Sequence, residues 1–138
     1  MLRFLGRGSA FCPDNNSAFY VDGTALILLD LPMSSFHKLI GIGLEALSGE
    51  AGIIRHIYVL VTHTHSDHIG GIPMLAHYAF YMWNKLPVTV VAPDAAVAED
   101  LHFFMDRLEG CDSKAYNIIT ADAFRYVKAV IPTQHLTG

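Results

Sequence analysis

The chain has 138 residues and a formal net charge of −4, and its nine basic residues give no electrostatic footprint for binding a nucleic acid. A single domain is expected at this length, and without a membrane-length apolar run or a signal-peptide core we expect a cytoplasmic protein that does not bind membranes. Hydrophobic residues make up 52% of the chain and charged residues 16%, which indicates apolar surface that a second half of the same fold or another subunit covers.

The first half of the chain is predicted to contain short strands and one helix. Strands are predicted at 3–5, 18–21, 25–29 and 57–61. Asp22-Gly23 is a hairpin signal between the second and third strands. Apolar residues at helical spacing predict a helix capped by Ser34 or Ser35 that runs to about Leu47, although Gly43 does not favour it.

The second half alternates between helices and strands. One helix is predicted over 72–85, with Pro73 in its first turn and an apolar stripe that belongs in the core. A second helix is predicted to begin after Asp94 as N-cap, with five residues facing inward: Val97, Leu101, Phe104, Met105 and Leu108. Further strands are predicted at 88–91, 117–120 and 125–131. The pattern predicts an α/β domain over 1–138, with a mixed β-sheet and flanking helices.

Four strong metal-ligand side chains follow the strand at 57–61: His63, His65, Asp67 and His68. Imidazole nitrogens and a carboxylate suit zinc and similar divalent ions. In an extended backbone the side chains of His63 and His65 point in the same direction. Those of the adjacent Asp67 and His68 point in opposite directions unless the turn changes the backbone conformation there. We therefore expect two ions, one bound by each pair. Gly70-Gly71 is expected to supply the conformational freedom of the turn, and a solvated histidine loop is the disfavoured alternative.

The spacing His63-x-His65-x-Asp67-His68 resembles the signature of the metallo-β-lactamase superfamily of hydrolases. Phe4-Leu5-Gly6-Arg7-Gly8-Ser9-Ala10, followed by Asn16-Ser17 and Leu29-Asp30, is similar to the opening of its ribonuclease Z-like branch. That branch begins with a Leu-Gly-x-Gly-Ser turn and a hairpin that ends in aspartate. The resemblance implies the first half of a four-layered αββα sandwich.

The resemblance also assigns residues outside the signature. It implies that His135 is the third ligand of the first ion, and that Asp30 orients a metal-bound histidine. Members of the superfamily supply a bridging aspartate and a further histidine to the second ion from later strands. Only three residues follow His135 here, so the second ion is expected to have only Asp67 and His68 from this chain.

The function that the resemblance implies is zinc-dependent hydrolysis. Two zinc ions would share a water, lower its pKa and polarise the bond to be cleaved, while Asp67 also orients the hydroxide. A small phosphodiester is the favoured substrate, with lactones, thioesters and β-lactams as alternatives. A metal-binding half-domain or fragment that needs a second half or another subunit, including a second copy in a homo-oligomer, is the competing interpretation, and a structural zinc module ranks last.

The other ligand-type side chains are expected to be structural. Four histidines lie in helical or pre-strand contexts and are interpreted as surface or satisfied core residues: His37, His56, His77 and His102. Cys12 and Cys111 are far apart in the sequence and lack metal-ligand spacing, so both are expected to be packing residues in a reduced compartment.

Overall fold

The structure is a computed structural model that describes residues 3–6, 17–48, 53–62 and 64–124. These residues form one six-stranded sheet whose strands lie in sequence order. The strands are β1 (Arg3–Gly6), β2 (Ser17–Asp22), β3 (Ala25–Leu29), β4 (His56–Leu60), β5 (Val88–Ala92) and β6 (Asn117–Thr120). β1, β2 and β3 pair antiparallel, whereas β3, β4, β5 and β6 pair parallel. The predicted α/β domain with a mixed sheet is confirmed.

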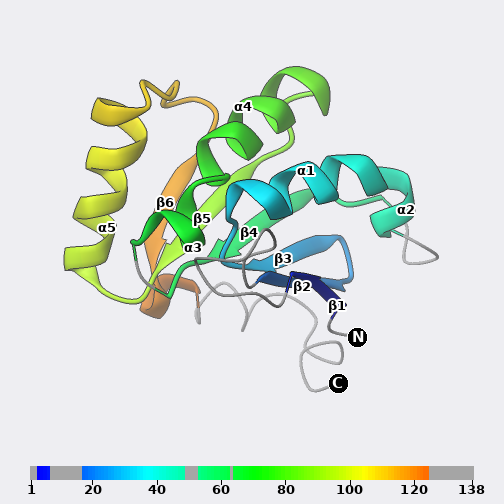
Figure 1. Ribbon diagram of the computed structural model, residues 1–138, viewed down its shortest axis with the longest axis horizontal. Coiled ribbons are helices and arrows are strands. Elements are labelled where there is room, and N and C mark those ends of the chain that lie inside the picture. The colour runs from blue at the N-terminus through cyan, green and yellow to red at the C-terminus, as the bar shows by residue number, and fades with distance from the viewer. Residues whose placement is uncertain (1–2, 7–16, 49–52, 63, 125–138) are drawn as a thin grey trace.

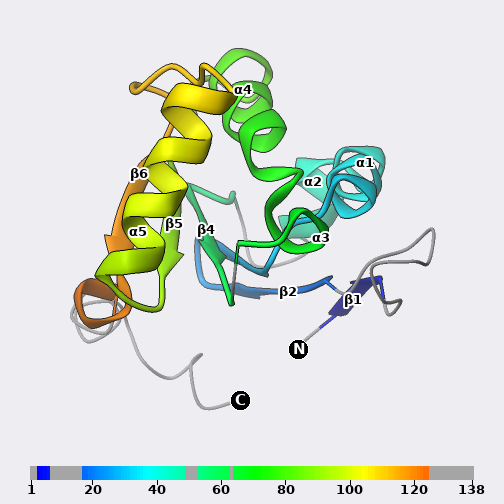
Figure 2. The ribbon, with the colours of Figure 1, turned by 60° about the vertical axis from the view of Figure 1, so that its left-hand side comes forward.

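Helices cover one face of this sheet (Figures 1 and 2). They are α1 (Met33–Ile42), α2 (Leu44–Ser48), α3 (Ser66–Ile69), α4 (Ile72–Met82), α5 (Ala95–His102) and the π-helix η2 (Phe103–Leu108). Strand side chains alternate between the two faces. Leu28 and Val59 therefore pack with the helices in the main core, while Ile27 and Tyr58 join a smaller cluster on the opposite face. The apolar stripe predicted for α4 lies in the main core.

The helix predicted to run to Leu47 is two helices. Gly43 separates α1 from α2 with a φ of 86°, a conformation that favours glycine. The predicted serine cap is also wrong, because Pro32 is the N-cap and its carbonyl accepts a 3.1 Å hydrogen bond from the Phe36 N–H. Ser35 lies inside α1 and is fully buried.

The predicted cap of α5 is confirmed, because Asp94 Oδ1 accepts a 2.9 Å hydrogen bond from the Val97 N–H. The inward-facing residues are predicted correctly at Leu101 and Met105, which are fully buried. The prediction fails at Leu108, which is 63% exposed. The exposure of Leu108 is explained by the π-helical turn. In this turn the Glu109 N–H donates a hydrogen bond to the Phe104 carbonyl, and the wider turn shifts the later residues around the helix axis.

Further expectations concern the two cysteines, the last predicted strand and membrane-spanning helices. Cys111 is buried, and burial together with nearby carboxylates raises the pKa of its thiol to about 11, in keeping with a packing residue. Cys12 and the predicted strand at 125–131 lie outside the described residues. Across the part of the chain that is described, no helix is both long and apolar enough to cross a membrane.

Candidate functional site

The candidate site begins where two neighbouring parallel strands end. β3 and β4 pair in a register that places Leu29 opposite Leu60. Asp30 follows β3 directly, and its N–H donates a 2.8 Å hydrogen bond to the Leu60 carbonyl. The residues after Leu29 and those after Leu60 therefore meet at one edge of the sheet, although more than thirty residues separate them in the sequence.

Asp30 links this edge to the histidine motif through its carboxylate. Its Oδ1 accepts a 2.8 Å hydrogen bond from the Thr62 N–H, and its Oδ2 accepts another of 2.8 Å from the Thr62 hydroxyl. Oδ2 also lies 2.7 Å from His68 Nδ1. Asp30 is only 6% exposed, so these polar partners replace the water that burial removes.

The backbone of Asp30 is also constrained. Its φ of 56° lies in the left-handed region, which aspartate tolerates better than most residues. The hydroxyl of Ser17 in β2 donates a 3.0 Å hydrogen bond to the Asp30 carbonyl. Side chains from β2 and from the segment after β4 thus hold Asp30 in place.

The contact with Asp30 bears on the tautomer of the His68 ring. A carboxylate accepts hydrogen bonds, so we infer that His68 Nδ1 carries the proton and donates it to Asp30 Oδ2. Nε2 is then left with a lone pair, which is the arrangement that orients a metal-binding histidine. The expected contact between Asp30 and a histidine of the motif is therefore present, and the histidine is His68.

The turn after β4 is compact because the chain forms the short helix α3 there. The His68 N–H donates a 2.8 Å hydrogen bond to the His65 carbonyl, and the Leu31 N–H donates one of 2.7 Å to the His68 carbonyl. The first bond closes the turn within the motif, and the second fixes the motif to the segment that follows Asp30. Asp67 and His68 therefore lie on one short helix rather than on an extended strand.

Gly71 supports this turn for a reason that the sequence did not reveal. Its φ is −89°, so left-handed freedom is not what the position requires. A Cβ at Gly71 would lie 2.6 Å from the Pro32 carbonyl oxygen and 2.9 Å from that of Leu31. The glycine is needed because two segments of backbone pass too close to admit a side chain.

The predicted ligands are only partly described. His65 is exposed at the start of the turn, and His68 is partly buried one turn later. His63, His135 and the side chain of Asp67 lie outside the described residues. Within the described part there is no group of three or more His, Cys, Asp or Glu positioned to hold a metal. The full ligand set remains a prediction, while His65 and the oriented His68 have the chemistry that zinc requires.

The histidines that were expected to be structural have ordinary surroundings. His37 and His102 are exposed. His56 Nε2 lies 2.7 Å from Thr89 Oγ1, and His77 Nε2 accepts a 3.4 Å hydrogen bond from the Asp112 N–H. The sequence alone does not indicate the part played by Thr62, because only the sheet register shows that Thr62 faces Asp30.

The fold and the turn at the end of β4 define a class of protein. Human tRNase Z, short form, superposes with a TM-score of 0.58 at 21% sequence identity, covering 88% of this chain and 47% of that structure. The metallo-β-lactamase fold protein YhfI from Bacillus subtilis superposes with a TM-score of 0.59 at 20% identity, covering 86% of this chain and 44% of that structure. The chain therefore has part of the metallo-β-lactamase fold, and it covers less than half of each of these structures, in agreement with the half-fold that the resemblance implied.

The family is narrower than this fold. The family model described as anti-Pycsar protein Apyc1 matches residues 1–129, and the chain belongs to this family. An anti-Pycsar protein Apyc1 from Paenibacillus harenae is 31% identical over 93 residues, covering 66% of this chain and 36% of the relative. One from Bacillus phage vB_BveM-Goe7 is 35% identical over 103 residues, covering 70% and 36%. The chain thus spans about a third of the length of these relatives, and its link to ribonuclease Z-like proteins is one of fold.

Proposed function

We propose that the chain contributes metal ligands to the hydrolysis of a phosphodiester in a small nucleotide. The observation that carries the proposal is the hydrogen bond of 2.7 Å between Asp30 and His68, because it presents His68 Nε2 at the end of β4 in a protein with a hydrolase-type fold.

Each ligand has an assigned role in this proposal. His63, His65 and His135 bind a first ion, and Asp67 and His68 bind a second. Zinc is the expected metal, because imidazole and carboxylate groups match its preferences. When bound, the ions supply polarisation of the phosphoryl group and a lowered pKa for water. The protein's own contribution is positional: Asp30 fixes the His68 ring, and Asp67 orients the attacking water.

Charge favours a small substrate over a long nucleic acid. Tight binding to a polyanion depends on many Lys and Arg contacts with phosphates, and this chain has nine basic residues and a net charge of −4. A single phosphodiester needs only local neutralisation. We therefore infer a 3′,5′-cyclic mononucleotide as the substrate class, in agreement with a family that is named for acting against Pycsar rather than for processing RNA.

A second candidate function is metal binding without catalysis by this chain alone. The favouring observation is that the matched region covers only 36% of the curated relatives. In this case a second half of the fold, or another subunit, supplies further ligands to the second ion. The two candidates agree on His63, His65 and His68 and differ in whether the chain turns over substrate.

The test combines metal content with turnover. The purified chain is loaded with zinc, its bound metal is counted by mass spectrometry, and its hydrolysis of bis(p-nitrophenyl) phosphate and of purine and pyrimidine 3′,5′-cyclic mononucleotides is measured. A generic lactone and a thioester are assayed in parallel. His65→Ala is the test variant, and His102→Ala is the matched control because His102 is an exposed histidine on α5.

Two bound ions and cyclic-nucleotide hydrolysis that His65→Ala abolishes and His102→Ala preserves are the results expected for an enzyme. Bound metal that depends on His65 without turnover of any substrate supports the second candidate. If zinc binding is absent, or is equally strong in His65→Ala, the metal site is wrong and both candidates fail.

A further inference from the structure

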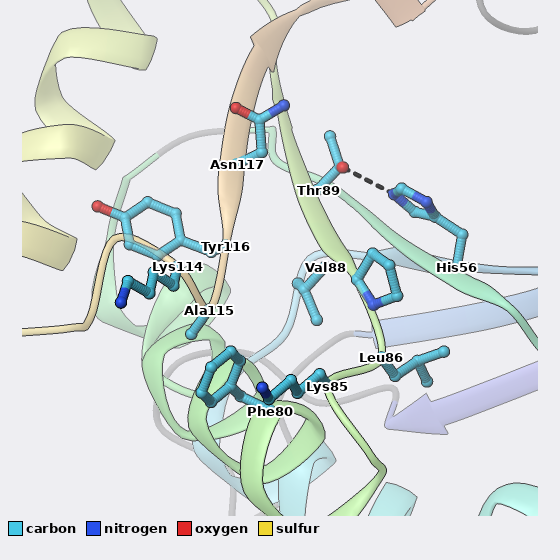
Figure 3. Close-up of a pocket in the computed structure, with 11 residues that line it drawn as sticks. His56, Phe80, Lys85, Leu86, Val88, Thr89, Lys114, Ala115, Tyr116 and Asn117 are labelled. Atoms are coloured by element: carbon cyan, nitrogen blue, oxygen red, sulfur yellow. Dashed lines mark hydrogen bonds between the residues drawn. The ribbon is translucent and has the colours of Figure 1, made fainter.

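A pocket of about 210 Å³ lies at the end of the sheet opposite the candidate metal site (Figure 3). The first residues of three parallel strands line it: His56 of β4, Val88 of β5 and Asn117 of β6. The histidine motif follows the other end of β4. At about 3.3 Å per residue, that strand places the Cα atoms of its two ends about 13 Å apart. The pocket is therefore separate from the site proposed above.

Two lysines give this pocket a positive charge. Lys85 and Lys114 line it, and none of the lining residues is Asp or Glu. This composition contrasts with that of the whole chain, whose net charge is −4. A concave surface with low-dielectric walls focuses the field of the charges that line it, which here are positive. Two carboxylates lie beside the lining: Asp106 accepts a hydrogen bond from the Tyr116 hydroxyl, and Asp112 accepts one from the Lys114 N–H.

Both lysines project from turns with fixed backbones. The Lys85 N–H donates a 3.0 Å hydrogen bond to the Phe80 carbonyl, and its ammonium group lies 5.7 Å from the centroid of the Phe80 ring. The Lys114 N–H donates a 2.9 Å hydrogen bond to Asp112 Oδ1. These hydrogen bonds set the backbone positions from which the two exposed side chains extend.

The rest of the pocket lining has a polar part and an apolar part. On one side, His56 is held by its 2.7 Å hydrogen bond with Thr89 and by stacking on the Tyr58 ring, with 4.3 Å between the ring centroids. On the other side, Phe80 and Leu86 present apolar surface, and Figure 3 shows Phe80 beside Lys85 and across the pocket from the His56–Thr89 pair. A ligand that suits this pocket has one polar, anionic end and one apolar end.

We propose that this pocket binds a small ring compound that carries one anionic group, either a phosphate or a carboxylate. The volume lies below the roughly 300 Å³ of a typical site for a drug-sized molecule, which suits a single substituted ring rather than a whole nucleotide. Lys85 and Lys114 bind the anionic group, and Phe80 and Leu86 cover the ring. The binding requires no metal and is independent of the proposed hydrolysis.

The test is a titration of the complete, ¹⁵N-labelled 138-residue chain followed by NMR amide shifts. The probes are phenyl phosphate, benzoate, inorganic phosphate and the uncharged benzyl alcohol, each with and without EDTA. The variants are Lys85→Gln, Lys114→Gln and the double variant. Lys38→Gln is the matched control, since Lys38 is an exposed lysine on α1 that does not line the pocket. The spectrum of each variant checks that it remains folded.

Saturable shifts centred on His56, Thr89 and Asn117, unchanged by EDTA, are expected with phenyl phosphate or benzoate, and the tighter of the two identifies the anionic group. Each pocket variant is expected to raise Kd at least about threefold, and Lys38→Gln to leave it unchanged. The proposal is overturned if inorganic phosphate or benzyl alcohol binds as tightly as the charged rings. Shifts centred on His65 and His68, equal weakening by Lys38→Gln, or the absence of binding also overturn it.

Discussion

The hydrogen bonds of Asp30 allow a prediction about both stability and metal affinity. Asp30→Ala removes the acceptor of three hydrogen bonds and places alanine at a φ of 56°. At about 1 kcal/mol for each hydrogen bond, with about 1 kcal/mol more for the backbone, we expect a loss of about 3 to 4 kcal/mol. Urea unfolding followed by circular dichroism measures this change.

Asp30→Asn separates orientation from stability. Asparagine also tolerates the left-handed conformation, and its oxygen can still accept from the Thr62 N–H. Its amide nitrogen then faces His68 Nδ1 and donates to it, so the imidazole proton moves to Nε2 and removes the lone pair that a metal needs. We expect a stability loss of only about 1 to 2 kcal/mol and zinc affinity reduced about 10- to 100-fold.

Two measurements check this variant. Histidine ¹⁵N chemical shifts report the tautomer of His68 in the absence of metal, and competition with a chromophoric chelator reports zinc affinity. Asp22→Asn is the matched control, because Asp22 is also buried in the sheet and its Oδ1 has no hydrogen-bond partner among the described residues. An unchanged His68 tautomer in Asp30→Asn, or an equal loss of zinc affinity in Asp22→Asn, would refute the reasoning.

Three further changes test the packing and electrostatics of the fold. Gly71→Ala should cost about 1 to 3 kcal/mol in urea unfolding, because its Cβ meets backbone oxygens, whereas Gly41→Ala in α1 has open space and should be neutral or stabilising. Burial lowers the pKa of His56, so the free energy of unfolding should fall as pH drops through the ordinary histidine pKa of about 6.5, and this fall should be smaller in His56→Gln. Asp94→Ala should cost about 1 kcal/mol, with Asp100→Ala in the same helix as the control; equal losses would contradict the capping argument.

The sequence was sufficient for the features that depend on local pattern. The helical stripe predicted for α4 lies in the main core, as its period indicates. The cap at Asp94 was also predictable, because a cap requires only a side chain and the N–H three residues later. These features depend on short stretches of chain and on one preferred geometry each.

The incorrect predictions fall at positions where the local sequence is compatible with two different backbone structures. Ser34 and Ser35 are good capping residues, but helix α1 begins after Pro32, so both serines lie within it. Leu108 fits the period of an α-helix, but the π-turn changes that period. The choice in each case belongs to the packing of the whole domain, which single-sequence patterns do not contain.

The site itself shows why motif spacing was necessary but not sufficient. The ligand-type residues after β4 lie close together in the sequence and can be recognised there. The orientation of His68, however, depends on Asp30, which lies 38 positions earlier. The parallel register of Leu29 with Leu60 brings the two together. Because successive strand residues face opposite sides, a slip of one residue would move Asp30 away from Thr62 and His68 and also turn Leu28 out of the main core. The burial that fixes the strand register therefore also places Asp30 beside Nδ1 of a candidate metal ligand.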